Sequence, residues 1–517
     1  MDETRAGKWR ALIGISILSI VVFVDFTVVN TILPGIQRDL NASVDDLQWV
    51  MNAFILMLTT SMVTAGRMGD IYGRRKVLYI GAIVFTAASL VAGMAESTNL
   101  LIACRFLQGA AGAITLTCGA ALVTHHFPES ESSKALAIFM SITGFGMAVG
   151  PVLGGLFLSF LSWRWAFYVN VPMVIIGFAI AWGAVRETPR QTDEKLDWLG
   201  LALFTPGMIA IVTFIVKGNN WGWDAPASIA VLAAGIVFLA AFIIVENRVE
   251  SPILDFKLFG IPLFLACNIM ALAIGAFIGL GFFLPSLYLQ VVRNELPYIA
   301  GLMLLPISAL VVIIPPLIGD LAEKNGPVRF IMTGLVFLVA AALAQSFFTP
   351  DSPALFVLFG LGLFGLGWGL MQATSTFAAT SALPATMSGL AIGVLYTVWN
   401  IGSSIGLAVG GLILEERDKA SLDAGLAQLD ITLDAKDQDL IRSVLSDPSQ
   451  ANKLLGELAP GLENKILPLF KNAFMAGYSG AMWFLFVFCL VCAIAFAAIV
   501  RADRSKQIPA QEEANAA

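Results

Sequence analysis

The sequence predicts an all-α protein that crosses a membrane many times, and two observations carry this prediction. Of the 517 residues, 58% are hydrophobic and only 13% are charged, whereas a soluble chain is about 25% charged. Apolar stretches of about 20 residues recur along the chain, which is the length that a helix needs to cross a bilayer. Helices also satisfy their own backbone hydrogen bonds inside lipid. The composition therefore excludes a soluble globular protein.

Fourteen apolar segments qualify as membrane spans. They cover residues 11–33, 47–66, 76–95, 98–123, 134–159, 165–185, 197–216, 227–245, 262–289, 297–318, 328–348, 354–379, 387–414 and 473–500. The first span follows Arg5, Lys8 and Arg10 and so imitates a signal peptide. Its apolar run is long for a signal core, and no small-residue cleavage site follows it. We therefore expect a retained first span.

Basic residues are distributed unequally between the two sides of these spans. The loops on the side of the N-terminus hold most of them, including the run at 74–76, whereas the short loops opposite hold Arg38, Arg164, Lys217 and Arg293. Cytoplasmic loops are enriched in basic residues. The asymmetry predicts that both termini lie in the cytoplasm.

One predicted external loop, residues 415–472, is polar, rich in acids and favourable to helices. Its spaced leucines are Leu440, Leu445, Leu454, Leu455 and Leu458. Pro448 and the Pro460-Gly461 pair interrupt it, which predicts short amphipathic helices folded as an external hairpin or lid. A passive cap is an equally open interpretation.

Asp25 lies deep in the first apolar run, after 14 residues without a charge from Ala11 to Val24. A charge at the centre of a membrane helix costs about 2.5–3.5 kcal/mol on insertion scales. Such groups usually face a bundle interior or a watery cavity, where they carry protons, ions or substrate charge. The alternatives are a solvated position near a helix end and a buried polar contact without further function.

Arg105 is a second charge inside an apolar span. A guanidinium stays ionised, so it needs an acid, carbonyl groups or water nearby. Asp25 is its obvious partner. The alternative is that Arg105 extends its side chain to the outer membrane interface.

Residues 66–76 link spans two and three and read Gly-Arg-Met-Gly-Asp-Ile-Tyr-Gly-Arg-Arg-Lys. Glycines allow a tight turn with positive φ, and the acid can face the positive N-terminal end of a neighbouring helix. The residues expected to control gating here are Gly66, Asp70, Gly73, Arg74 and Arg75. Basic residues that only obey the positive-inside rule are the alternative, which the ordered spacing disfavours.

Span five carries Gly146, Gly150 and Gly154 on one helix face, with Pro151 beside them. Small residues let membrane helices approach closely, and proline removes a helical hydrogen bond. The pattern fits a bent helix that seals a path. It fits ordinary glycine packing equally well.

Together these segments resemble the motifs of the major facilitator superfamily, in its fourteen-span drug:proton antiporter branch. The matching segments are residues 25–34, 66–76, 105–109 and 146–155, and residues 163–172 and 196–200 also resemble that branch. The resemblance implies two six-helix bundles related by a pseudo-two-fold axis, joined by two extra transmembrane helices. The implied parts are residues 1–190, 191–255 and 256–517, the last including the loop 415–472. Residues 319–329 resemble a worn copy of the 66–76 motif without its basic cluster, which argues against a latch there.

The family implies a proton-coupled exporter of lipophilic or cationic drugs in the bacterial inner membrane, which would confer antibiotic resistance. Asp25 would bind the proton, and Arg105 would set its affinity. The implied partners are a small-molecule substrate, protons and the lipid bilayer, with no nucleic acid, no cofactor and no metal, and we expect a monomer. An exporter of an endogenous metabolite, such as a siderophore or lipid precursor, is the alternative.

Polar and aromatic residues of facing spans are candidates for contact with substrate, because aromatic rings bind cations and flat apolar molecules. These candidates are Asn30, Met57, Phe282, Tyr288, Tyr396, Trp399 and Asn400. For each, core packing or anchoring at the membrane interface is the competing explanation. A membrane enzyme is disfavoured, since the chain has no phosphate-binding Gly-Lys-Ser/Thr loop, no His-Glu-x-x-His and no nucleophile elbow.

Overall fold

The computed structural model describes residues 5–42, 44–190, 197–249, 256–295, 297–428 and 463–516. Every regular element within these residues is a helix, which confirms the predicted class. The first seven are α1 (Arg5–Leu40), α2 (Val44–Tyr72), α3 (Arg74–Gly93), α4 (Thr98–His126), α5 (Glu129–Phe160), α6 (Trp165–Tyr168) and α7 (Asn170–Ala181). Next come α8 (Trp198–Trp221), α9 (Pro226–Glu246), α10 (Pro262–Leu287), α11 (Pro297–Asn325), α12 (Pro327–Ser346), α13 (Ala354–Ser381), α14 (Ser388–Gln428) and α17 (Glu463–Ala516).

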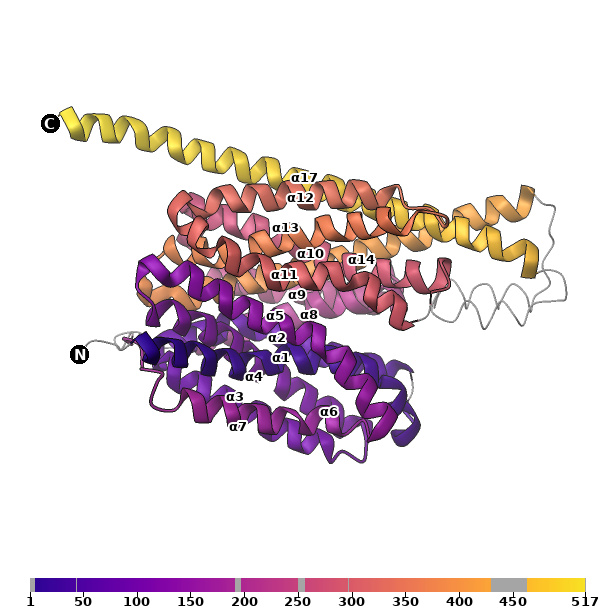
Figure 1. Cartoon of the computed structure of the whole chain (residues 1–517), viewed down its shortest axis with the longest axis horizontal. Coiled ribbons are helices and arrows are strands. Elements are labelled where there is room, and N and C mark those ends of the chain that lie inside the picture. Colours follow the sequence, from indigo (N-terminus) through magenta and orange to yellow (C-terminus); the bar gives the residue numbers. More distant parts are fainter. Residues whose placement is uncertain are drawn as a thin grey trace.

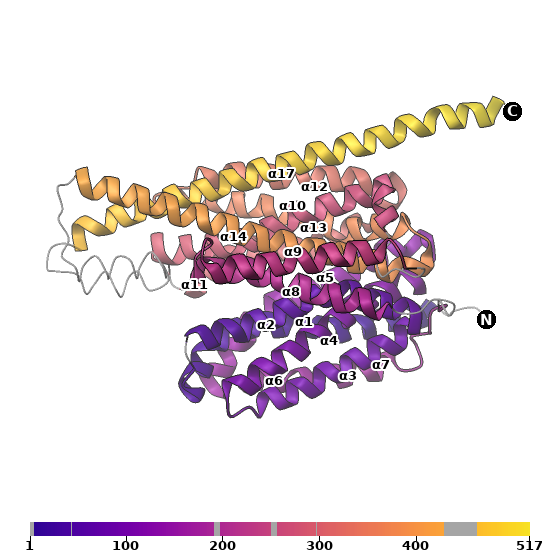
Figure 2. The same ribbon diagram turned by 180° about the vertical axis from the view of Figure 1, so that it is seen from behind.

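The helices pack into two groups. Helices α1 to α7 pack mainly on one another, and so do α10 to α14 with α17 (Figure 1). The two groups meet where α5 packs on α11 and where α2 packs on α14, while α8 and α9 pair with each other and α8 lies against α2 and α14 (Figure 2). Both termini lie at one end of the molecule (Figure 1). We call the opposite end the far end.

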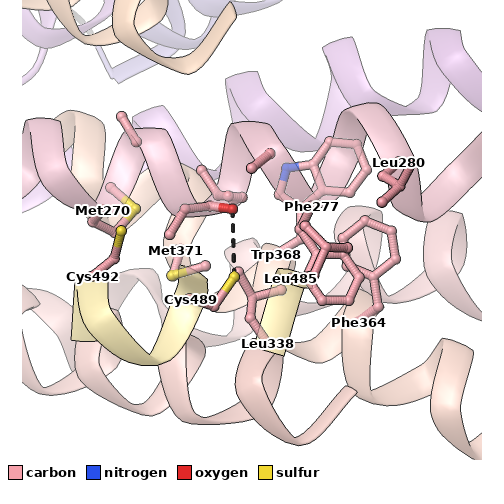
Figure 3. Packing of buried hydrophobic residues seen from close by; sticks show 14 of the residues in the cluster. Met270, Phe277, Leu280, Leu338, Phe364, Trp368, Met371, Leu485, Cys489 and Cys492 are labelled. Atoms are coloured by element: carbon pink, nitrogen blue, oxygen red, sulfur yellow. Dashed lines mark hydrogen bonds between the residues drawn. The ribbon is translucent and has the colours of Figure 1, made fainter. Parts of the chain in front are cut away.

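The interior of the second group is apolar and aromatic. Phe277 of α10 and Phe364 of α13 have ring centroids 4.5 Å apart, and Trp368 continues the stack (Figure 3). Cys489 of α17 lies beside them with its Sγ 3.8 Å from the Ala273 carbonyl oxygen. These contacts hold α10, α13 and α17 together by close van der Waals packing, which is what drives helix association inside lipid.

Twelve helices in the described residues are long and apolar enough to cross a membrane, and two shorter apolar segments, Trp165–Ala181 and Trp198–Phe214, accompany them. These fourteen segments are compatible with the fourteen expected spans. The sixth is divided into α6 and α7 at Val169, but the backbone there stays helical, with φ of −60° and ψ of −27° and the Val169 N–H on the Trp165 carbonyl, so Trp165–Ala181 runs on as one slightly irregular helix. Pro172 accounts for the irregularity, because it has no N–H to bond the Tyr168 carbonyl one turn earlier.

The far-end extension of α14 and α17 differs from the sequence expectation. Residues 415–428 and 463–472 are not separate short helices but continuations of α14 and α17. The intervening leucines and prolines, in residues 429–462, lie outside the described residues. Since α14 has 41 residues, it is about 60 Å long, twice the roughly 30 Å hydrocarbon core. Both helices project past their neighbours at the far end (Figure 1).

Two hydrogen bonds mark the level at which the neighbouring helices end. The Tyr478 hydroxyl donates to Gln345 Oε1 at 3.1 Å, and the Ser479 hydroxyl donates to the Ser346 carbonyl at 2.9 Å. Ser346 is the last residue of α12. The turns of α17 before Tyr478, and the turns of α14 packed on them, therefore lie beyond the membrane-spanning part.

Candidate functional site

A buried ion pair lies inside the first helix group. Arg105 Nη1 of α4 donates to Asp25 Oδ2 of α1, and both side chains are fully buried. Arg105 Nε also donates to the Val50 carbonyl of α2 at 3.0 Å, and the guanidinium lies 4.2 Å from the centroid of the Phe54 ring. A charge in lipid is tolerated when it is paired and hydrogen-bonded. The predicted partners thus lie together, and Arg105 does not extend to the interface.

Two amides and a hydroxyl complete the surroundings of the carboxylate. Asn170 Nδ2 donates to Asp25 Oδ1 at 2.9 Å, and Gln108 Nε2 donates to the same oxygen at 3.2 Å. Both amides also donate to Ser89 Oγ, at 3.2 and 2.8 Å respectively. Helices α1, α3, α4 and α7 therefore converge on one carboxylate.

Two polar atoms of this network are unsatisfied in the described part of the chain. Arg105 Nη2 and Asn170 Oδ1 are buried and make no hydrogen bond within the described residues. Buried polar atoms without partners are uncommon and call for an explanation. A donor and an acceptor are thus available if the carboxylate changes its charge or its position.

Sequence reasoning missed Ser89, Gln108 and Asn170 as site residues. Gln108 and Asn170 lie within segments that resemble the antiporter branch, so their polarity inside apolar spans was an available signal. Ser89 gave none, because serine is common in membrane helices.

The 66–76 motif joins the two helix groups. Asp70 and Arg74 form a buried ion pair at 2.8 Å. Asp70 Oδ2 accepts a hydrogen bond of 3.0 Å from the Leu390 N–H in the first turn of α14, and Arg74 Nη2 donates to the Thr386 carbonyl at 3.2 Å. An acid at a helix N-terminus is stabilised by the helix dipole. A Cβ on Gly66 would lie 2.2 Å from the Gly389 carbonyl oxygen, so only glycine permits this approach.

Glu187, which sequence reasoning also missed, fixes the other side of this motif. Its two carboxylate oxygens accept the backbone N–H groups of Arg75 and Lys76, at 3.0 and 3.1 Å, in the first turn of α3. Gly73 has φ of 101° and leaves room for this carboxylate. The Arg75 side chain lies over the Tyr79 ring at 5.5 Å.

A second link between the groups involves residues 319–329, the segment that resembles the 66–76 motif without its basic cluster. Lys134 Nζ of α5 and Asp320 Oδ2 of α11 are 2.8 Å apart, with side chains 40% and 55% exposed. The sequence argued against a latch here. The ion pair is present, but its exposure limits it to about 0–1 kcal/mol.

The glycine face of α5 packs directly on α1. A Cβ on Gly150 would lie 1.8 Å from Thr27 Oγ1, and the same atom on Gly146 or Gly154 would lie 2.7 Å from α1 side chains. This α5 face therefore touches the helix that carries Asp25. The side chain of Pro151 lies outside the described residues.

Three of the substrate-contact candidates gather on α14. The Tyr396 hydroxyl lies 3.5 Å from Met140 Sδ of α5, and Asn400 Nδ2 lies 3.5 Å from Met62 Sδ of α2. Trp399 packs between Tyr396 and Trp368, with centroids 6.0 and 6.3 Å away. This face of α14 therefore meets the first helix group. A substrate site formed jointly by the two helix groups would need such a position.

The remaining candidates lie elsewhere. Asn30 is exposed and donates to the Phe26 carbonyl of its own helix, while Met57 packs against Gly109 of α4. Tyr288 is fully buried inside the second group, and its hydroxyl donates a hydrogen bond of 2.8 Å to the Thr349 carbonyl. It lies apart from the α14 face, and its contact with substrate stays a prediction. The side chain of Phe282 lies outside the described residues.

Comparison with known proteins agrees with this arrangement. Residues 15–407 match the family model of the Major Facilitator Superfamily. The chain belongs to the major facilitator superfamily. It is thus a multi-pass membrane protein of a transporter family.

Two named relatives align with most of the length of this superfamily member. It is 32% identical to the multidrug resistance protein Stp of Mycobacterium tuberculosis, over 85% of this chain and 82% of that one. It is 30% identical to the multidrug efflux pump LfrA of Mycolicibacterium smegmatis, over 82% and 84%. The crystal structure of the human organic anion transporter MFSD10 matches with a TM-score of 0.61, 15% identity, and coverage of 93% and 99%, which supports the fold alone.

Proposed function

We propose that this chain exports lipophilic or cationic drugs from the bacterial cytoplasm in exchange for protons, by alternating access. The observation that carries the proposal is the fully buried Asp25–Arg105 pair, held by the amides of Gln108 and Asn170. Relatives named as multidrug resistance and efflux proteins support the substrate class. With both termini in the cytoplasm, the 66–76 motif lies at the cytoplasmic end and the far end lies outside.

Proton uptake acts on the ion pair. A proton bound at Asp25 Oδ2 removes the charge that Arg105 contacts. The guanidinium keeps its bonds to the Val50 carbonyl and to Gln108 Oε1, the latter at 2.9 Å, and its Nη1 contact with the acid weakens. Protonation therefore shifts the balance of contacts from α1 toward α2 and α4.

Helix α2 carries this shift to the second group. It packs closely on α4, since a Cβ on Gly109 would lie 2.3 Å from the Phe54 carbonyl oxygen. The last turn of the same helix carries Asp70, which accepts a hydrogen bond from the Leu390 N–H of α14. Movement of α2 would loosen that contact and open the cytoplasmic side to substrate. One proton crossing 100 mV supplies about 2.3 kcal/mol, besides the pH gradient.

The test is efflux of a fluorescent lipophilic cation in proteoliposomes with an imposed pH gradient. We expect gradient-driven transport by the unmodified protein and its loss in Asp25→Asn. Asp351→Asn, at an exposed acid in the loop after α12, is the matched control and should transport normally. Undiminished coupling in Asp25→Asn would place the proton site elsewhere, and absence of transport by the unmodified protein would contradict the substrate class.

A further inference from the structure

Asp418 is a buried acid that the proposed transport cycle does not use. It lies on the far-end extension of α14, is 2% exposed, and its Oδ1 makes no hydrogen bond within the described residues. No ion pair reaches it in that part of the chain. An ionised carboxylate in such a place is costly unless it is paired.

The surroundings of Asp418 form an apolar seam between two antiparallel helices. Leu414, Asp418 and Leu422 recur every four residues and are all buried, so they share one face of α14. Leu414 contacts Gly477 of α17, and Gly425, three residues beyond Leu422, contacts Leu469. Asp418 therefore faces α17 between these two contacts. The buried apolar side chains of α17 along this stretch are Ile466, Phe470, Ala473, Phe474 and Met475.

Other charged groups lie off the seam. Those on α14 that flank Asp418 are exposed, namely Glu415, Glu416, Arg417, Lys419 and Asp423. On the facing stretch of α17 the described charged side chain is Lys471, which is half-buried beside the seam. At the outer end of α10, Tyr288 and Arg293 bond to the backbone of the loop after α12, and Tyr478 bonds to Gln345. None of these groups forms a described bond with Asp418.

We propose that Asp418 is a proton-binding site on the outer side of the protein, and that its protonation locks the hairpin formed by the outer ends of α14 and α17. A neutral carboxyl fits an apolar seam, whereas an ionised one favours opening of the seam to water. The inference does not depend on which molecule is transported. Only its placement on the outer side uses the proposed orientation.

Burial gives the sign and the working range of this switch. Desolvation raises the pKa of the Asp418 carboxyl from the ordinary 3.8 to about 7. Because the packed form holds its proton more tightly, the lock is complete below about pH 4, weakens as the pH rises to 7, and changes little above that. For these two pKa values, the equilibrium constant for opening rises about thirty-fold between pH 5.5 and pH 8.

Helix continuity connects the switch to the rest of the molecule. The same helix runs unbroken from Leu390, which bonds to Asp70, past Tyr396 and Trp399 to Asp418. A hairpin locked by external protons would thus fix the outer end of the helix that carries the candidate substrate residues. External acidity would act on the transporter through α14.

Hydrogen–deuterium exchange of the full-length protein in lipid nanodiscs tests this inference. After correction for the intrinsic pH dependence of exchange, residues 412–427 and 466–477 should open about thirty-fold more at pH 8 than at pH 5.5 in the unmodified protein. Asp418→Asn, which keeps the size but cannot ionise, should show no such change. Asp423→Asn, an exposed acid on the same helix, is the control and should behave like the unmodified protein.

Two outcomes would overturn the proposal: flat protection in the unmodified protein across this range, or an undiminished rise in Asp418→Asn. If Asp418→Asn does not fold, Asp418→Leu replaces it, because leucine continues the seam of Leu414 and Leu422. That variant should be protected at both pH values. A pH-dependent opening in Asp418→Leu would equally refute the role of the carboxyl.

Discussion

At the scale of single residues, the carboxylate of Asp25 depends on neutral groups as much as on Arg105. Asn170→Leu removes the 2.9 Å bond to Asp25 and the bond to Ser89. A hydrogen bond to a charged group contributes about 1.5–3 kcal/mol, so we expect gradient-driven efflux to fall at least tenfold. Transport assays with purified protein measure this. Asn268→Leu is the control, because within the described part of the chain that buried amide bonds only to the Phe264 carbonyl of its own helix. An equal loss there would indicate a general effect of removing buried amides.

The charged residues at this site stand out in the sequence, whereas their neutral partners give at most a weak signal, which is polarity within a motif segment for Gln108 and Asn170 and none for Ser89. A charge inside an apolar run is conspicuous because lipid penalises it, so Asp25 and Arg105 stand out unaided. Ser89, Gln108 and Asn170 become partners only when α3, α4 and α7 converge on α1. Side-chain chemistry alone does not specify that convergence.

At the scale of helices, the contact between α1 and α5 leaves no room for a side chain. Gly150→Ala would place a methyl group 1.8 Å from Thr27 Oγ1, so one of the helices must shift. Overpacking of this kind costs about 1–3 kcal/mol, and the thermal unfolding temperature of the purified protein should fall. Gly155→Ala is the matched control, since nothing lies within 4 Å of its Cβ position. Equal unfolding temperatures for the two variants would contradict close packing at Gly150.

Hydropathy located the helices well and their ends poorly. Lipid imposes apolar runs of a set length, so the positions of the long apolar helices follow from the sequence. Beyond the membrane this constraint ends. The charged residues 415–419 suggested a loop, yet α14 continues through them because Leu414, Asp418 and Leu422 form one buried face. Similarly, the local irregularity before Asn170 arises from one missing N–H at Pro172.

At the scale of the whole molecule, two links made by charged side chains join the helix groups at the end that carries the termini, and they differ in burial. Asp70 is buried and bonds to Leu390 and Arg74, whereas Lys134 and Asp320 are exposed. A buried hydrogen bond to a charged group contributes about 1.5–3 kcal/mol, but an exposed ion pair contributes about 0–1 kcal/mol and is screened by salt. The first link should therefore control closure.

Distances between the two groups can test this difference. Spin labels at the exposed positions Lys76 and Ser381, introduced as cysteines, would report the separation near α3 and α13 by pulsed electron resonance. We expect Asp70→Asn to move a large part of the population to longer distances, because the carboxylate that accepts the Leu390 N–H is lost. Asp320→Asn should leave the distance distribution nearly unchanged. Raising the salt concentration, which screens the same exposed pair, should change the distribution of the unmodified protein no more than Asp320→Asn does. A reversed order, with Asp320→Asn separating the groups and Asp70→Asn leaving them together, would mean that the exposed pair holds the closed form.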